Sequence, residues 1–144
     1  MPGIVVGVDG SEHSQLALEW AMKEAALRHA PLTVLTVHQV AGSYWSGTPT
    51  IYPADQPEVE KVREAAEAAA QEAAGRLAAQ PASVITRAVS GLPAMELINA
   101  SHDADLVVVG SRGGGGFGSL LMGSVSNQVV NHAACPVVVV RSQR

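Results

Sequence analysis

The chain has 144 residues, of which 47% are hydrophobic and 15% charged, and this composition suits a single globular domain with a substantial core. Its formal net charge of −4, without any cluster of Lys and Arg, excludes a nucleic-acid-binding face, because phosphate backbones are neutralised by gathered cations. No apolar run approaches the roughly 20 residues that span a bilayer, and no signal-peptide pattern opens the chain. A single cysteine, Cys135, excludes an internal disulfide and is expected to be a small buried residue beside the last strand. We therefore expect a cytoplasmic protein.

The first half of the chain alternates short apolar runs with longer amphipathic stretches. Residues 4–8 form a β-branched run that predicts a buried strand, and a helical pattern follows from Ser11. Residues 32–37 predict a second strand. Residues 39–57 hold several Gly and Pro, which predicts a long irregular connection. Residues 58–79 carry Val, Ala and Leu at steps of three and four, which predicts a packed helix.

The second half continues the same alternation. Residues 83–89 predict a third strand, and Pro93 suits the first turn of a short helix, where its missing N–H costs little. Residues 106–109 predict a fourth strand, which leads into a glycine-rich stretch. A further helix is expected from about Ser124, and residues 136–140 predict the last strand.

Strands and helices that alternate in this way predict an α/β fold. The strands are apolar without polar alternation, which is typical of parallel strands covered on both faces. Right-handed crossovers then place helices on both sides of the sheet and give a doubly wound domain over residues 1–144. The strand order does not follow from these patterns alone. In such sheets ligands bind beyond the carboxyl ends of the strands, where the strand order reverses.

Two loops at that edge have the chemistry of a binding site. One is Asp9-Gly10-Ser11 after the first strand, and the other follows the fourth strand with the spacing Gly110-x-x-Gly113-(nine residues)-Gly123-Ser124. Glycine lets the backbone approach a ligand, so that successive N–H groups form a nest for an anion. The free N–H groups and the dipole of the helix that begins near Ser124 favour a phosphate, and its first-turn hydroxyls, those of Ser124 and Ser126, can add hydrogen bonds. Such a site needs no Lys, and none follows Lys61.

Several of these residues also have ordinary structural interpretations. Residues 113–116 are all glycine, which suits a mobile linker between domains. Here they join a buried strand to a helix within one domain, so the linker interpretation fits less well. Arg112 is the cation nearest the loop, and a solvated surface side chain is its simpler interpretation. Asp9 can cap the first helix, but Ser11 is available for that role. His38 can be an ordinary residue at the end of a strand.

The glycine spacing resembles the nucleotide signature of the universal stress protein family, in its ATP-binding branch. The similarity extends over essentially the whole chain, and it is weaker and partly generic in the strands, at Val5-Val6-Gly7-Val8-Asp9-Gly10-Ser11, Val89-Ser90-Gly91-Leu92-Pro93, Ala104-Asp105-Leu106-Val107-Val108-Val109 and Cys135-Pro136-Val137-Val138-Val139-Val140. The resemblance implies a Rossmann-like, adenine nucleotide alpha hydrolase-like sheet of order 3-2-1-4-5. It also implies a homodimer formed through the last strand, where a free edge otherwise invites pairing.

The resemblance further implies how ATP lies in the site. The adenine borders Val37 and His38, Asp9 lies near the ribose, and the glycine-rich loop with the start of the last helix holds the phosphates. The implied ligand-binding set is Asp9, Val37, His38, Gly110, Arg112, Gly113, Gly123, Ser124, Val125 and Ser126.

The function that these features favour is a nucleotide-responsive regulatory module that a protein partner reads, as in a stress response. The alternative is a slow ATPase or nucleotidyl-transfer enzyme that uses the same loop. Catalysis is disfavoured because phosphoryl transfer needs cationic stabilisation, and the loop has neither a Gly-Lys-Ser/Thr pattern nor an acidic residue. Mg²⁺ carried by ATP can engage Ser124, and the histidines show no metal-binding spacing. A flavin carrier is a third possibility, but the loop at Asp9 is too short and too acidic for it.

Overall fold

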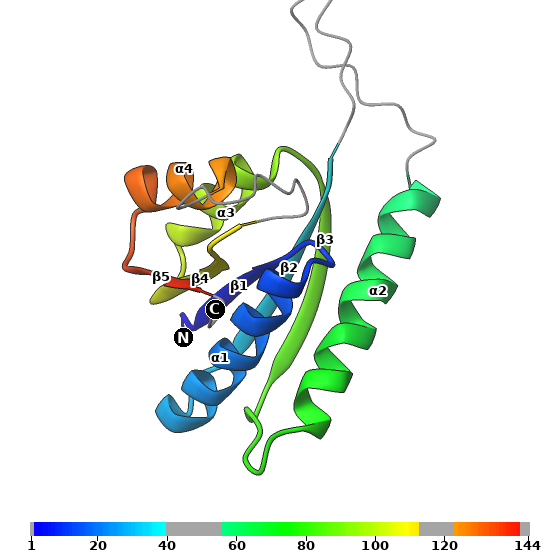
Figure 1. The fold of residues 1–144 in the computed structure, drawn as a ribbon, viewed down its shortest axis with the longest axis vertical. Helices are drawn as coiled ribbons and strands as arrows, with labels where there is room; N and C mark the ends of the chain where they lie inside the picture. The colour runs from blue at the N-terminus through cyan, green and yellow to red at the C-terminus, as the bar shows by residue number, and fades with distance from the viewer. Residues whose placement is uncertain (1, 40–55, 113–122, 142–144) are drawn as a thin grey trace, which may run out of the picture.

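The computed structural model describes residues 2–39, 56–112 and 123–141. Strands and helices alternate strictly along these residues. The elements are β1 (Ile4–Val8), α1 (Glu12–Arg28), β2 (Leu32–Gln39), α2 (Gln56–Gly75), β3 (Val84–Gly91), α3 (Pro93–Ser101), β4 (Leu106–Gly110), α4 (Ser124–His132) and β5 (Val137–Val140). The strands form one parallel sheet of order β3-β2-β1-β4-β5, and helices cover both of its faces (Figure 1). The predicted fold and strand order are therefore confirmed.

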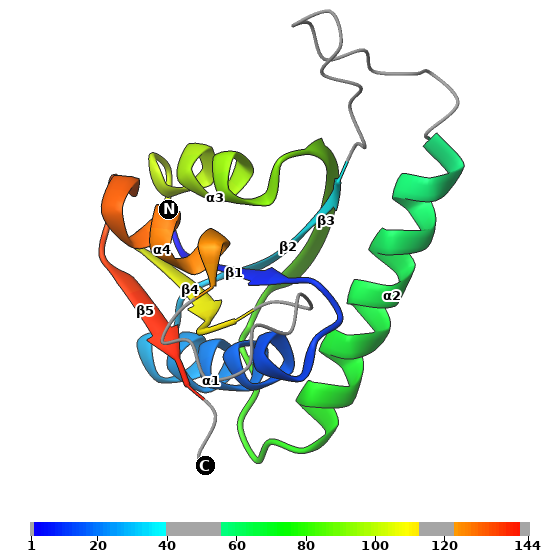
Figure 2. The same ribbon diagram turned by 45° about the horizontal axis from the view of Figure 1, so that its top comes forward.

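The core consists of one apolar layer on each face of the sheet. Side chains of a strand alternate between the two faces, so that Ile4 and Val6 of β1 pack under α1 and α2, while Val5 packs on the side of α3 and α4. Figure 2 shows these two helix pairs on opposite sides of the sheet. The central strands are buried on both faces, and this explains the unbroken apolar runs in the sequence.

Some helix and strand boundaries differ from the predicted ones. A strand is longer where its backbone makes further hydrogen bonds, and shorter where its backbone cannot make them. β2 extends to Gln39 because it stays paired with β3 as far as Gly91. β5 begins at Val137, one residue later than predicted, since Pro136 has no N–H to give to the sheet. α2 ends at Gly75 instead of residue 79, and the chain continues from there in tight turns. None of the helices that the structure describes is long and apolar enough to cross a membrane.

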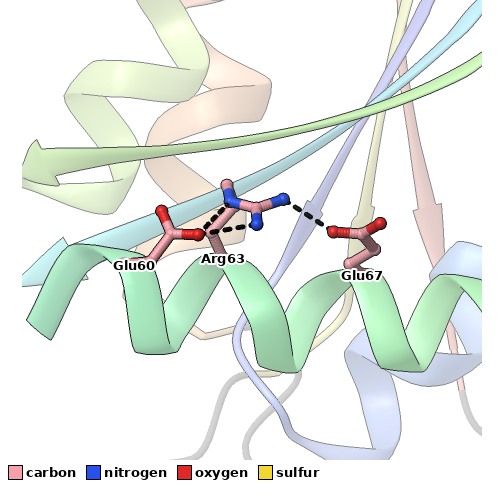
Figure 3. A network of polar contacts seen from close by, with 3 residues as sticks. All are labelled: Glu60, Arg63 and Glu67. Atoms are coloured by element: carbon pink, nitrogen blue, oxygen red, sulfur yellow. Dashed lines mark hydrogen bonds and ion pairs between the residues drawn. The ribbon is translucent and has the colours of Figure 1, made fainter. Parts of the chain in front are cut away.

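α2 carries a chain of ion pairs centred on Arg63 (Figure 3). Its Nη2 lies 2.6 Å from Oε1 of Glu60, and its Nη1 lies 2.6 Å from Oε2 of Glu67. The hydrogen bond from Arg63 holds the pKa of Glu60 below its ordinary value. Pairs at these spacings support an exposed helix, because residues three and four apart lie one above the other. The paired side chains stay partly exposed, while Ala66, Ala70 and Ala73 of the same helix are buried against the core.

Candidate functional site

A cavity of about 700 Å³ opens at the carboxyl edge of the sheet. β1 pairs with both β2 and β4, so the strand order reverses between β1 and β4, and the loops after these two strands meet there. The described members of the predicted binding set all line the cavity; they are Asp9, Val37, His38, Gly110, Arg112, Gly123, Ser124, Val125 and Ser126. Gly113 lies outside the described residues.

The N-terminus of α4 presents unused backbone donors to this cavity. Gly123 is the N-cap residue, and no side chain caps the helix. The N–H of Gly123 donates to the carbonyl oxygen of Ser111 at 2.7 Å, but no described residue accepts a hydrogen bond from the N–H of Ser124, Val125 or Ser126. The first turn also contains no acidic residue. Three donors at the positive end of a helix dipole are suited to an anion such as a phosphate.

Ser126 and Ser124 play different parts in this turn. Ser126 is 3% exposed, and its hydroxyl donates to the carbonyl oxygens of Ser111 (3.0 Å) and Gly123 (3.1 Å). The hydroxyl of Ser126 thus fastens the start of α4 to the end of β4, and its N–H is the group left for a ligand. Ser124 is exposed, so its hydroxyl is accessible.

Sequence reasoning did not single out Ser111, which is 4% exposed and connects three elements. Its N–H donates to the carbonyl oxygen of Val140 in β5 at 2.9 Å, and its own carbonyl accepts from the first turn of α4. Its hydroxyl lies 3.5 Å from Nδ1 of His13 in α1. The glycine spacing leaves this position unrestricted, so the sequence carries no signal for it.

Gly110 has a packing requirement in addition to its predicted place at the phosphates. A Cβ atom at this position would lie 2.7 Å from the carbonyl oxygen of His13, closer than real contacts allow. Glycine is therefore needed where the end of β4 passes the first turn of α1.

The turn after β1 separates the roles of Asp9 and Ser11. The Ser11 hydroxyl caps α1 by accepting from the N–H of Ser14 at 3.2 Å. Oδ1 of Asp9 accepts from the N–H of Ser11 at 2.9 Å, and Gly10 between them has a φ of 85°. Ser11 is thus the cap, and Asp9 shapes the turn with its exposed side chain at the cavity.

The wall formed by α2 was not anticipated. Lys61 and Glu58 line the cavity, with Nζ of Lys61 3.8 Å from Oε1 of Glu58. Lys61 therefore joins Arg112 among the cations that line the cavity, although the glycine-rich loop itself contains no lysine. The helical pattern of the sequence predicts α2 itself. It does not predict that the first turns of this helix line the cavity.

Val37 and His38 line the cavity near the end of β2, half-buried and on opposite faces of the sheet. Across the described residues, no group of three or more His, Cys, Asp and Glu side chains could hold a metal ion. Cys135 is half-buried, less enclosed than expected, and packs against the apolar layer beneath α3 and α4.

Known proteins resemble this chain over almost its whole length. The profile of the Universal stress protein family matches residues 2–141. The chain is 38% identical over 145 residues to universal stress protein Rv2005c of Mycobacterium tuberculosis, across 97% of this chain and 48% of that protein. It thus spans about half the length of the curated relatives that it matches.

Solved structures share the whole fold. UspA of Lactobacillus plantarum superposes with a TM-score of 0.71 at 26% identity, with 97% of each chain covered. A universal stress protein solved in complex with cAMP superposes with a TM-score of 0.68, also at 26% identity, over 99% of this chain and 98% of that chain.

Proposed function

Because the chain belongs to the universal stress protein family, we propose that it binds ATP in the cavity at the carboxyl edge of its sheet and acts as a nucleotide-responsive regulatory module. The proposal rests chiefly on the three N–H groups of Ser124, Val125 and Ser126, which face this cavity without an acceptor among the described residues. Donors of this kind bind phosphate without help from a lysine.

The proposed orientation places the phosphates at α4 and the adenosine end at β2. Asp9 lies between the two, where its carboxylate can accept from ribose hydroxyls, and Arg112 lies near the phosphate end. Magnesium would reach the site on the triphosphate, with the Ser124 hydroxyl as a protein contact. The similar protein solved with cAMP supports an adenine nucleotide as the class of ligand.

A binding role suits the site better than catalysis. Phosphoryl transfer depends on cations gathered around the transferred group. The described cations of the cavity, Arg112 and Lys61, come instead from different walls, and Lys61 is paired with Glu58. We therefore propose that occupancy is read by a partner protein in the cytoplasm, where the lone thiol of Cys135 stays reduced.

We also propose that two copies of the chain pair through β5. This strand is at one edge of the sheet, and all four of its valines are only half-buried. An apolar edge strand invites a second strand, and an antiparallel copy related by a two-fold axis satisfies both edges at once. Analytical ultracentrifugation of the protein tests this, and a monomer at micromolar concentration would contradict it.

The experiment for the nucleotide site replaces Gly123 with Asp and measures ATP binding by calorimetry. Asp is a preferred N-cap residue, and the backbone of Gly123 (φ −75°, ψ 166°) accepts it without strain, so the fold should be retained. The new carboxylate occupies the donors that we assign to phosphate, so binding should be lost. Gly75→Asp is the matched control, because open space surrounds that position. Unchanged ATP affinity in folded Gly123→Asp would refute the proposed function.

Mass spectrometry of the native protein supplies a second, independent measurement. We expect ATP, ADP or AMP to be released from freshly purified protein. A bound flavin in its place would also refute the proposal.

A further inference from the structure

One side of α1 carries a row of apolar side chains that the core of the domain does not fully cover. Leu16 and Trp20 are four residues apart and Trp20 and Leu27 seven apart, so all three lie along the same side of the helix. Leu27 is 76% exposed, while Leu16 and Trp20 are half-buried. We call these three residues the α1 flank. Scattered exposed apolar residues are ordinary, whereas a row of them beside further apolar surface marks a contact site.

The contacts of α1 with its neighbours fix the direction of this flank. Nε2 of Gln15 lies 3.5 Å from the carbonyl oxygen of Ala69, so the opposite side of α1 faces α2. His13, seven residues before Trp20 and on the same side of the helix, lies against the end of β4, with its Nδ1 3.5 Å from the Ser111 hydroxyl. Figure 2 likewise shows α1 between β5 and α2. The α1 flank therefore lies on the side of the helix that faces β4 and β5.

The α1 flank continues into the apolar edge of β5. Val138 and Val140 pack against the same core cluster as Trp20, on the face of the sheet that α1 covers. Both valines are only half-buried, because β5 is the last strand of the sheet. The flank and these two valines thus form one apolar surface along this side of the domain.

β5 by itself is too short to hold two copies of the chain together. Its four residues span about 13 Å, and the edge with its side chains is about 10 Å high. A strip of this size is far smaller than the area of about 800 Å² that each partner buries in a stable interface. Pairing through β5 therefore needs further surface beside the strand, and the α1 flank adjoins it.

Resting on the proposed pairing through β5, we infer that the α1 flank docks on a second copy of this chain, with Trp20 as its anchor. A two-fold axis that pairs the two β5 strands antiparallel also places the two α1 flanks on the same side of the joined sheet. Trp20 is the middle residue of α1, and large aromatic side chains near the centre of an interface contribute most to binding.

The first test measures the dimer dissociation constant of the full chain by sedimentation equilibrium. Leu27→Lys puts a charge on the α1 flank, and we expect it to raise the dissociation constant by about tenfold. Lysine suits a helix nearly as well as leucine and Leu27 is exposed, so the monomeric variant should unfold at the same urea concentration as the monomeric native chain. Met95→Lys is the matched control, because Met95 is 51% exposed on α3, which covers the other face of the sheet.

The second test follows Trp20 directly by fluorescence. The chain has two tryptophans, so Trp45→Phe leaves Trp20 as the only one. As the protein concentration rises through the dissociation constant, the emission of Trp20 should shift to shorter wavelength, because docking removes its exposed part from water. Leu27→Lys in the same background should move this shift to higher protein concentration.

Three results would overturn the inference and leave the pairing through β5 standing. They are an equal dissociation constant for Leu27→Lys and the native chain, an equal weakening by Met95→Lys, and a constant Trp20 emission while the dimer forms. A native chain that stays monomeric at micromolar concentration would overturn the pairing and the inference together. The nucleotide site is independent of all these results, because ATP calorimetry of Gly123→Asp tests it separately.

Discussion

The hydroxyl of Ser126 donates to the carbonyl oxygen of Ser111 at 3.0 Å and so joins the first turn of α4 to the end of β4. The same carbonyl accepts the N–H of Gly123 at 2.7 Å. These two hydrogen bonds aim the helix N-terminus into the cavity before any ligand arrives. The phosphate site that we propose is thus preorganised by contacts within the protein.

Ser126→Ala and Ser124→Ala should separate anchoring from ligand contact. Loss of the buried Ser126 hydroxyl leaves the Ser111 carbonyl with one fewer donor, so the free energy of unfolding should fall by about 1 kcal/mol. Ser124→Ala removes an exposed hydroxyl and should leave stability unchanged, while ATP binding weakens by about 1–3 kcal/mol if a charged acceptor loses its donor. Urea unfolding and calorimetry on both variants measure the contrast, and equal stability losses would argue against it.

Gly110→Ala should be strongly destabilising. The added methyl group would meet the carbonyl oxygen of His13 at 2.7 Å, so β4 and α1 must move apart, at a cost on the order of 1–3 kcal/mol for overpacking. Gly75→Ala is the control, because nothing lies within 4 Å of the new methyl group, and alanine suits a helix end better by up to about 1 kcal/mol. Denaturant midpoints that shift in the same direction for both variants would contradict this account.

Glycine in place of the histidine that follows α1 and glycine in place of the histidine that follows α3 should change the stability of the fold in opposite directions. His29 ends α1 in the left-handed conformation (φ 55°, ψ 38°), whereas His102 ends α3 in the right-handed helical one (φ −66°, ψ −25°). His29→Gly should therefore stabilise the fold by about 0.5–1 kcal/mol through relief of strain. His102→Gly should destabilise it by a similar amount, because glycine gains only flexibility there. Thermal unfolding midpoints of the two variants should shift in opposite directions.

The thiol of Cys135 should react slowly near neutral pH. Burial raises its pKa above the ordinary value, so the thiolate, the reactive form, appears only at higher pH. A raised thiol pKa also means that this residue's contribution to stability is complete below the ordinary pKa and is lost as the pH rises through the raised one. Iodoacetamide labelling between pH 7 and 10, compared with the urea-unfolded chain, measures the shift. Equal rates in both states at every pH would contradict it.

Sequence patterns predicted most of the fold because its elements are separated by strong local signals. β1 begins and ends where the apolar run predicts, α3 begins at Pro93 as expected, and α4 begins at the expected Ser124. The end of β2 was less accessible to prediction, because its last residues owe their strand conformation to pairing with β3. Long-range pairing of this kind leaves no local trace in composition.

The glycine spacing predicted the part of the candidate site that the loops form. No sequence pattern predicted the part that α2 forms. Gly110 ends β4, Asp9 follows β1 and Gly123 caps α4, so all three lie where elements meet loops and loop chemistry can be read directly. Lys61 and Thr36 come from the middle of regular elements, where periodicity predicts burial or exposure but not the cavity that they border. Their meeting depends on how α2 packs across β2, which the sequence specifies only through the complete fold.

The hydrogen bond from Gly123 to Ser111 has an evolutionary consequence, since it joins two main-chain groups. No substitution at either position removes the carbonyl, and only proline removes the N–H. The direction of α4 can therefore persist while side chains around it diverge. Relatives that keep the strand, the turn and the helix can keep the anchor, even where too few identical residues remain to reveal it.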